Sequence, residues 1–203
     1  MHSLEKLAEL FNRFPGIGPR QSKRFVYFLL ATPRGYREEL ARLLLELKNA
    51  ATPCARCQRF FTAGKGTRLC SICLDENRDP ATLMIVEKDV DLETIERSHA
   101  YQGTYFVLGG TVPILEKNPA DRIRLKELQK HLEERLQNGL KELVLALSLT
   151  AEGEHTAEHV QEFLRPLAEK GLKISMLGRG LSTGSELEYA DPETIRNALK
   201  NRQ

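Results

Sequence analysis

The sequence lacks any apolar segment close to the roughly 20 consecutive residues that a membrane-spanning helix requires. Its first residues form an amphipathic pattern with acidic side chains at Glu5 and Glu9, which is not typical of a secretory signal peptide. Internal repeats and low-complexity tracts are also absent, so the pattern does not indicate a repeat protein. We therefore expect a cytoplasmic protein without a membrane partner, with 203 residues for one substantial domain and a smaller one.

Cysteine is scarce: the chain has 4, and all of them belong to two Cys-x-x-Cys pairs, CARC and CSIC. Two such pairs, here in the pattern C-x2-C-x12-C-x2-C, can present four thiolates tetrahedrally to one Zn²⁺ ion. Disulfides are not expected in a reducing cytosol. We expect one structural zinc ion per chain, with iron or a redox pair as the alternatives. The predicted ligands are Cys54, Cys57, Cys70 and Cys73.

The net charge is small, at +2, but the charges are unevenly distributed along the chain. Residues 1–80 have 14 Lys and Arg against 8 Asp and Glu, a balance of +6. Residues 81–203 have 16 against 20, a balance of −4. This asymmetry indicates a basic half that binds a partner and an acidic half, whereas the alternative is a chance distribution of solvated charges.

Apolar residues recur at helical spacing through the first 50 residues, interrupted by FPGIGP and TPRG. From residue 82 the pattern changes to four short apolar runs, with helical patterns between them at about 90–98, 120–138 and 155–170. Such alternation is typical of a mostly parallel sheet with helices on its faces. The predicted strands are TLMIV (82–86), TYFVLGG (104–110), ELVLALS (142–148) and KISMLG (173–178).

The C-terminal part contains a glycine-rich loop, GRGLSTGSELEYAD (178–191), followed by a last helix with Asp191 as N-cap and Pro192 at its first position. Together these patterns predict an α+β protein built from several modules. The expected modules are a helical region (1–53), a four-cysteine zinc module (54–73), an α/β sheet domain (81–176) and the C-terminal loop and helix (177–203).

The segment FPGIGPRQSKRF between the first two helices has the composition of a helix-hairpin-helix turn. Its glycines can adopt positive φ and let a DNA backbone approach closely, and the N-terminus of the second helix attracts phosphate. Contacts to phosphate carry no sequence information, so we expect sequence-independent binding; an ordinary helix–helix turn is the alternative. The candidate DNA-binding residues are Gly16, Gly18, Arg20, Lys23 and Arg24.

Acidic residues follow two of the predicted strands: Glu87 comes after the first strand, and Glu152 and Glu154 come after the third. If these strands are neighbours, the acids share one crevice at the carboxyl edge of the sheet. The tip of the third strand lacks aspartate and offers Ser148 and Thr150, so tight Mg²⁺ binding is not expected. Solvated acids at loop starts or helix N-termini are the alternative.

The motifs GIGPRQSKR, CARC…CSIC, AEGEHTA and GLSTGSELEYAD, in this order, resemble the RecR family of bacterial recombination mediators over essentially the full chain. The sheet domain resembles the Toprim domain of topoisomerases and primases, with its two aspartate positions at Ser148 and Thr150. The resemblance assigns the hairpin cations most directly to Arg20 and Arg24, and the Toprim acids to Glu87 and Glu152. For the C-terminal segment the resemblance implies subunit contacts, with a nucleotide-binding-like motif as the alternative. One stretch, TVPILEKNPADRIRL (111–125), departs from the family pattern.

The resemblance implies a non-catalytic DNA-repair protein that forms dimers and ring-like tetramers around duplex or gapped DNA. Such proteins act with RecO and RecF to help load the recombinase RecA. A second hypothesis is a Mg²⁺-dependent Toprim nuclease or primase-like phosphotransferase that uses the three glutamates, and a third is a zinc-dependent protein-interaction module. The missing aspartates argue against the second hypothesis, and the basic hairpin argues against the third.

Overall fold

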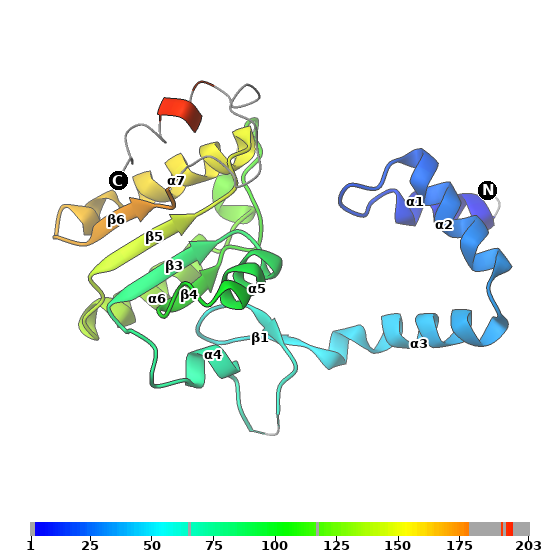
Figure 1. Ribbon diagram of the computed structural model, residues 1–203, viewed down its shortest axis with the longest axis horizontal. Helices are drawn as coiled ribbons and strands as arrows, with labels where there is room; N and C mark the ends of the chain where they lie inside the picture. The colour runs from blue at the N-terminus through cyan, green and yellow to red at the C-terminus, as the bar shows by residue number, and fades with distance from the viewer. Residues whose placement is uncertain (1–2, 65, 117, 179–191, 193, 197–203) are drawn as a thin grey trace. The chain divides into compact units, whose positions relative to one another are not determined.

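The computed structural model describes residues 3–64, 66–116, 118–178, 192 and 194–196 (Figure 1). The chain divides into two compact units, residues 1–51 and 52–203. The predicted glycine-rich loop and its Asp191 N-cap lie outside the described residues apart from Gly178, while Pro192 and residues 194–196 are helical. Among the described residues, no helix combines the length and the apolar character that crossing a bilayer requires.

The first unit is helical, as predicted, and its second and third helices begin at a proline or at the residue after one. Pro19 occupies the first turn of the second helix, where its missing N–H costs nothing, and Pro33 precedes the third. The helices are α1 (Ser3–Phe11), α2 (Pro19–Ala31) and α3 (Arg34–Ala50).

The first unit has almost no interior of its own. The rings of Phe11 and Phe25 meet edge to face at 5.6 Å between α1 and α2. Among the described residues of this unit, only Ser22 and Val26 are buried. Because few apolar side chains are covered, the three helices do not enclose a core within one chain.

The second unit is built on a parallel sheet with the strand order β4-β3-β5-β6 (Figure 1). The chain passes from β3 to β4 on one side and then returns to β5 on the other side of β3. The order therefore reverses between β3 and β5, and open sheets of this kind bind ligands at such a point. The strands are β3 (Thr82–Val86), β4 (Thr104–Val107), β5 (Glu142–Ala146) and β6 (Lys173–Met176).

Both faces of the sheet are covered around β3 and β4, which explains why these two strands are buried almost continuously rather than in alternation. In β3, Leu83 and Ile85 face a core that includes residues of α6 (Leu125–Gln137) and α7 (Ala151–Ala168). The alternate residues Met84 and Val86 pack with α5 (Asp89–Ser98) and the cysteines. The cysteine module therefore belongs to the core of the second unit.

Short elements complete the second unit. A two-residue antiparallel pair flanks the first cysteine pair, and one helical turn contains the last cysteine. A single 3-10 turn precedes α6, so that α6 begins later than the pattern from residue 120 predicts. These elements are β1 (Thr52–Pro53), β2 (Phe60–Phe61), α4 (Ser71–Leu74) and η1 (Pro119–Asp121).

The sequence prediction for the start of α7 is wrong by four residues. A helix beginning near residue 155 is expected, but α7 begins at Ala151. Thr150 is its N-cap, and its Oγ1 accepts a 3.1 Å hydrogen bond from the backbone N–H of Gly153. Glu152 and Glu154 therefore lie in the first turn of the helix and not in a loop.

Candidate functional site

The turn between α1 and α2 presents its glycines to open space. Gly16 adopts a φ of 73°, a conformation that residues with a side chain rarely take. Gly18 is extended, with a φ of −91° and a ψ of 175°, and is the N-cap of α2. No described atom lies within 4 Å of a β-carbon built on either glycine, so the turn is accessible to a large ligand.

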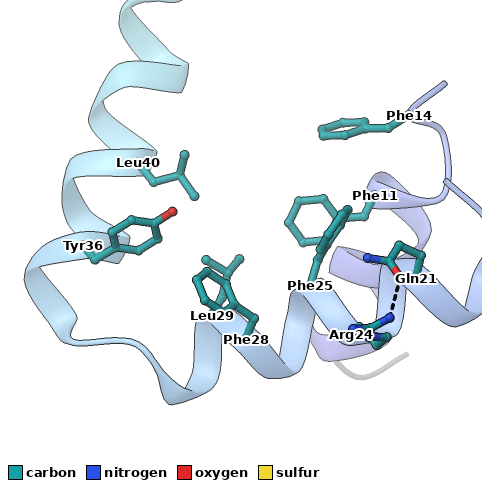
Figure 2. Close-up of a pocket in the computed structure, with 9 residues that line it drawn as sticks. All are labelled: Phe11, Phe14, Gln21, Arg24, Phe25, Phe28, Leu29, Tyr36 and Leu40. Atoms are coloured by element: carbon teal, nitrogen blue, oxygen red, sulfur yellow. Dashed lines mark hydrogen bonds between the residues drawn. The ribbon is translucent and has the colours of Figure 1, made fainter. Parts of the chain in front are cut away.

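Three cations follow this turn on one side of α2. Arg20, Lys23 and Arg24 are exposed and lie within the first two turns of the helix. The Arg24 Nη1 donates a 3.1 Å hydrogen bond to the Oε1 of Gln21, which orients the guanidinium (Figure 2). The first N–H groups of a helix have no acceptor within it, and the helix dipole adds positive potential. This surface is suited to binding phosphate.

An apolar groove lies on the same helices, and we refer to it as the helical groove. Its larger part has a volume of about 960 Å³ and is lined by leucines and phenylalanines of α1, α2 and α3. A second part of about 500 Å³ contains aromatic rings that face one another across it (Figure 2). Two edge-to-face ring pairs, Phe11–Phe14 at 5.6 Å and Phe28–Tyr36 at 6.0 Å, line this second part.

The four cysteines come together in the second unit. All are buried, and their sulfur atoms lie within 4.8 Å of one another. The Sγ atoms of Cys57 and Cys70 are 3.6 Å apart. Four sulfurs at about 2.3 Å from a central ion would be separated by about 3.8 Å, so the cluster fits a tetrahedral metal site.

The electrostatics of the cluster also favour a cation at its centre. The side chain of Cys57, followed by Cys70 and Cys73, lowers the pKa of Cys54. Contact with the Cys54 sulfur and burial raise the pKa of Cys57. Four thiolate charges this close together repel one another, so a cation between the sulfurs would stabilise the deprotonated cluster.

One backbone hydrogen bond joins the cysteine module to the edge of the sheet, and a side-chain bond links the two halves of the module. The N–H of Val107 in β4 donates to the carbonyl oxygen of Cys57 at 2.9 Å. On the other side of the module, the Arg56 Nη1 donates to the carbonyl oxygen of Cys73 at 3.0 Å. The cysteine module therefore covers part of an edge strand that would otherwise expose unpaired backbone groups.

Arg124 is a connecting residue that the sequence analysis does not identify. Its Nη1 donates to the carbonyl oxygens of Gln58 at 2.9 Å and Val107 at 3.2 Å, and its guanidinium lies over the Phe60 ring at 5.7 Å. Arg124 therefore joins the segment before α6 to both the cysteine module and β4. Since it lies among four other charged residues in ADRIRLKE, the sequence offers no signal that separates it from a solvated cation.

The structure brings Glu87 and Ser148 together at the carboxyl edge of the sheet, because β3 and β5 are neighbours. Glu87 is buried, and its Oε1 accepts a 2.6 Å hydrogen bond from the backbone N–H of Ser148. The hydroxyl oxygens of Ser148 and Thr150 are 2.9 Å apart. The Oε2 of Glu152 accepts a 3.2 Å hydrogen bond from Thr111.

These acids are engaged in bonds that shape the strand ends, and they do not converge on one point. Within the described residues, the four cysteines are the only group of three or more His, Cys, Asp and Glu side chains close enough to share a metal ion. Glu87, Glu152 and Glu154 form no such group. The geometry at the strand tips is that of a hydroxyl-lined edge rather than a two-cation centre.

A helical hairpin, a four-cysteine cluster and a parallel sheet with Glu87 at its switch point define a multi-module protein of the Toprim class. Three family models match the chain: "RecR, helix-hairpin-helix" at residues 4–48, "Toprim domain" at residues 81–178 and "RecR, C-terminal" at residues 180–203. The chain belongs to the RecR family.

Curated relatives are similar in sequence to this chain over nearly its full length. The chain is 38% identical to the recombination protein RecR of Roseiflexus sp. over 198 residues, which cover 98% of this chain and 92% of the relative. It is 34% identical to that of Chlorobium luteolum over 200 residues, with 98% and 96% covered. The recombination protein RecR of Bifidobacterium longum subsp. infantis is 35% identical over 202 residues, with 99% and 96% covered.

Proposed function

We propose that this protein is a non-catalytic recombination mediator of DNA repair that binds duplex and gapped DNA without sequence preference. In this role it acts in the cytoplasm with RecO and RecF to help load RecA. Membership of the RecR family supports the role, since the curated relatives carry the name recombination protein RecR. The observation that carries the DNA contact is the row of exposed cations after an open glycine turn.

DNA binding follows from the electrostatics of that surface. One phosphate accepts hydrogen bonds from the first N–H groups of α2, and Arg20 and Arg24 approach the flanking phosphates. Lys23 adds charge on the same turns, while Gly16 and Gly18 leave room for the backbone of the duplex. Contacts of this kind release counterions, so affinity depends steeply on salt and not on sequence.

We propose zinc as the ion of the four-cysteine cluster. Four thiolates in a closed, buried arrangement suit structural Zn²⁺, and no ligand position is left for water or substrate. The ion neutralises the thiolates and holds the module against β4 and the sheet. The cluster therefore contributes to folding and takes no part in chemistry.

The helical groove supports the proposal that the protein self-associates. Most of the apolar side chains that line the groove stay at least partly exposed in their own unit, and Leu43, Leu44, Leu45 and Leu47 of α3 are exposed. We propose that a second copy of the chain covers this surface, and that the C-terminal segment 177–203 makes further subunit contacts. A dimer or ring-like tetramer places several hairpins on one duplex, which multiplies a weak phosphate contact by avidity.

An enzymatic role for the strand-tip acids has less support. A Toprim nuclease or primase-like phosphotransferase requires carboxylates that hold Mg²⁺, and Glu87, Glu152 and Glu154 do not form a group close enough to do so. The positions where catalysis would need aspartate are Ser148 and Thr150. We therefore propose that the strand tips are a partner surface or a vestigial metal site.

The DNA-binding proposal is tested by fluorescence anisotropy with a gapped duplex across a salt series, with Mg²⁺ present. The double variant Arg20→Ala/Arg24→Ala is expected to bind every sequence more weakly, with a salt slope lower by about 2 for each hairpin engaged. Arg97→Ala/Arg165→Ala is the matched control, because it removes two exposed charges from the second unit. Unchanged binding in the hairpin variant, or cleaved DNA, would contradict the proposal.

Self-association is tested separately by sedimentation velocity. Leu44→Glu places a charge in the helical groove and is expected to shift the assembly to smaller species. Leu115→Glu is the control, since Leu115 is 92% exposed in the second unit. If the assembly of Leu44→Glu equals that of the wild type, a second copy does not cover the groove.

A further inference from the structure

Two histidines lie one turn apart on α7, and neither has been given a role above. The ring centroids of His155 and His159 are 5.1 Å apart, and their planes cross at 70°. Both side chains are partly exposed. They lie in the second and third turns of a helix whose start is fixed by the Thr150 cap. The two imidazoles are therefore neighbours on a well-anchored element and are accessible from solvent.

The spacing of the two histidines is that of helical metal sites. Side chains at i and i+4 lie on the same face of a helix, one above the other. The segment His155-Thr-Ala-Glu-His159 has the His-x-x-x-His spacing by which two imidazoles on one helix bind the same metal ion. Imidazole nitrogen is a preferred ligand of Zn²⁺, Ni²⁺ and Cu²⁺.

The surrounding charge favours a cation. The first three turns of α7 contain Glu152, Glu154 and Glu158, and Glu162 follows in the fourth, whereas Arg165 is the only Lys or Arg of the helix. Arg165 forms an ion pair with Glu162. The acidic side chains therefore raise the local concentration of cations around the imidazoles.

We propose that His155 and His159 form a second metal site, which binds a divalent transition metal ion of the Zn²⁺, Ni²⁺ and Cu²⁺ group. Within the described residues no third side chain is close enough to complete a three-ligand group with them. Two imidazoles and solvent water therefore coordinate the ion. The site is distinct from the four-cysteine cluster in ligands, exposure and coordination, and it does not depend on the proposed DNA-binding function.

An isothermal titration of the zinc-loaded full chain with NiCl₂ tests this proposal. The wild type is expected to bind one more nickel ion per chain than either His155→Ala or His159→Ala. Because even outer partners of metal ligands change affinity by about 10- to 100-fold, loss of one ligand should weaken this site at least tenfold. Nickel that enters the cysteine cluster would do so in the wild type and in both variants, and cancels in the comparison.

Two further variants separate metal binding from a purely aromatic contact. His159→Phe keeps a ring pair of two aromatic side chains but removes one ligand, so it should lose the extra nickel ion while α7 stays folded. Gln161→Ala, on an exposed position of the same helix, should retain it. If the wild type binds no more nickel than His155→Ala and His159→Phe, the histidines are an aromatic pair and the proposal is overturned.

Discussion

The carboxylate of Glu87 accepts a 2.6 Å hydrogen bond from the backbone N–H of Ser148, across 61 residues of sequence. This bond joins the ends of β3 and β5, the two strands between which the order of the sheet reverses. A ligand or metal site in a sheet of this kind would lie at the same point. In this chain, Glu87 lies at that point, and its carboxylate accepts a hydrogen bond from the backbone at the end of the neighbouring strand.

Glu87→Ala is expected to lower the free energy of unfolding by about 1–3 kcal/mol, because a buried acceptor is lost and the Ser148 N–H is left without this partner. Glu87→Gln keeps an acceptor oxygen and should lose less. Urea unfolding of the full chain measures both. Equal stability of the alanine variant and the wild type would show that the bond has no structural role. Mg²⁺-dependent DNA cleavage that folded Glu87→Gln loses would indicate an enzymatic role for this acid.

Gly153→Ala is expected to destabilise the protein, although alanine normally favours a helix over glycine by up to about 1 kcal/mol. A β-carbon at Gly153 would lie 2.1 Å from the carbonyl oxygen of Ser148, so the turn between β5 and α7 would have to move. Gly35→Ala in α3 is the matched control, because no described atom lies within 4 Å of its β-carbon. Thermal unfolding should therefore shift in opposite directions for the two variants.

Hydrophobic pattern is sufficient to locate the four strands of the sheet domain. The pattern is clearest in β3 and β4, where burial on both faces of the sheet leaves a continuous apolar run. TLMIV at residues 82–86 is predicted and found with the same bounds. The start of α7 is not predicted, because Glu-Gly-Glu resembles a loop. Glycine is needed at position 153 because the backbone of Ser148 packs directly against it. This contact is a property of the folded structure, and the sequence pattern does not reveal it.

The candidate functional residues differ in the same way: some of their contacts follow from neighbouring residues in the sequence, and others depend on how distant segments pack together. The spacing of the cysteines predicts that they can share a metal, since two short turns determine most of the geometry. Whether Glu87 lies beside Ser148 depends on strand order, which no local pattern contains. Similarly, the periodicity of α3 marks its leucines as apolar, but it does not show that their own unit leaves them exposed.

Replacement of Cys54 by serine is expected to unfold or aggregate the chain, since metal binding by the cluster is part of the folding free energy. The cysteines pack with Met84 and Val86 of β3, so loss of the ion should also expose one face of the sheet. Zinc content by atomic absorption and dye binding to exposed apolar surface provide the measurements. A metal-free, soluble and fully folded Cys54→Ser protein would show that the cluster does not depend on metal.

Stability is expected to fall with acidification because of His131. Burial, followed by the positive charge of Arg135, lowers the pKa of His131 to about 4, from an ordinary value of 6.5. The unfolded chain therefore binds the proton first as the pH falls below about 6.5, and the free energy of unfolding decreases until about pH 4. Over this range the effect is about 3 kcal/mol, since one pKa unit corresponds to about 1.4 kcal/mol.

His131→Leu removes this titration, so its stability should depend less on pH than that of the wild type between pH 6.5 and 4. The comparison is needed because acid also protonates the cysteine ligands, and that effect is common to both proteins. Urea unfolding at a series of pH values, with zinc in the buffer, measures the difference. Parallel pH profiles of the two proteins would show that His131 is not buried as a neutral imidazole against Phe106, on which its ring stacks at 5.7 Å.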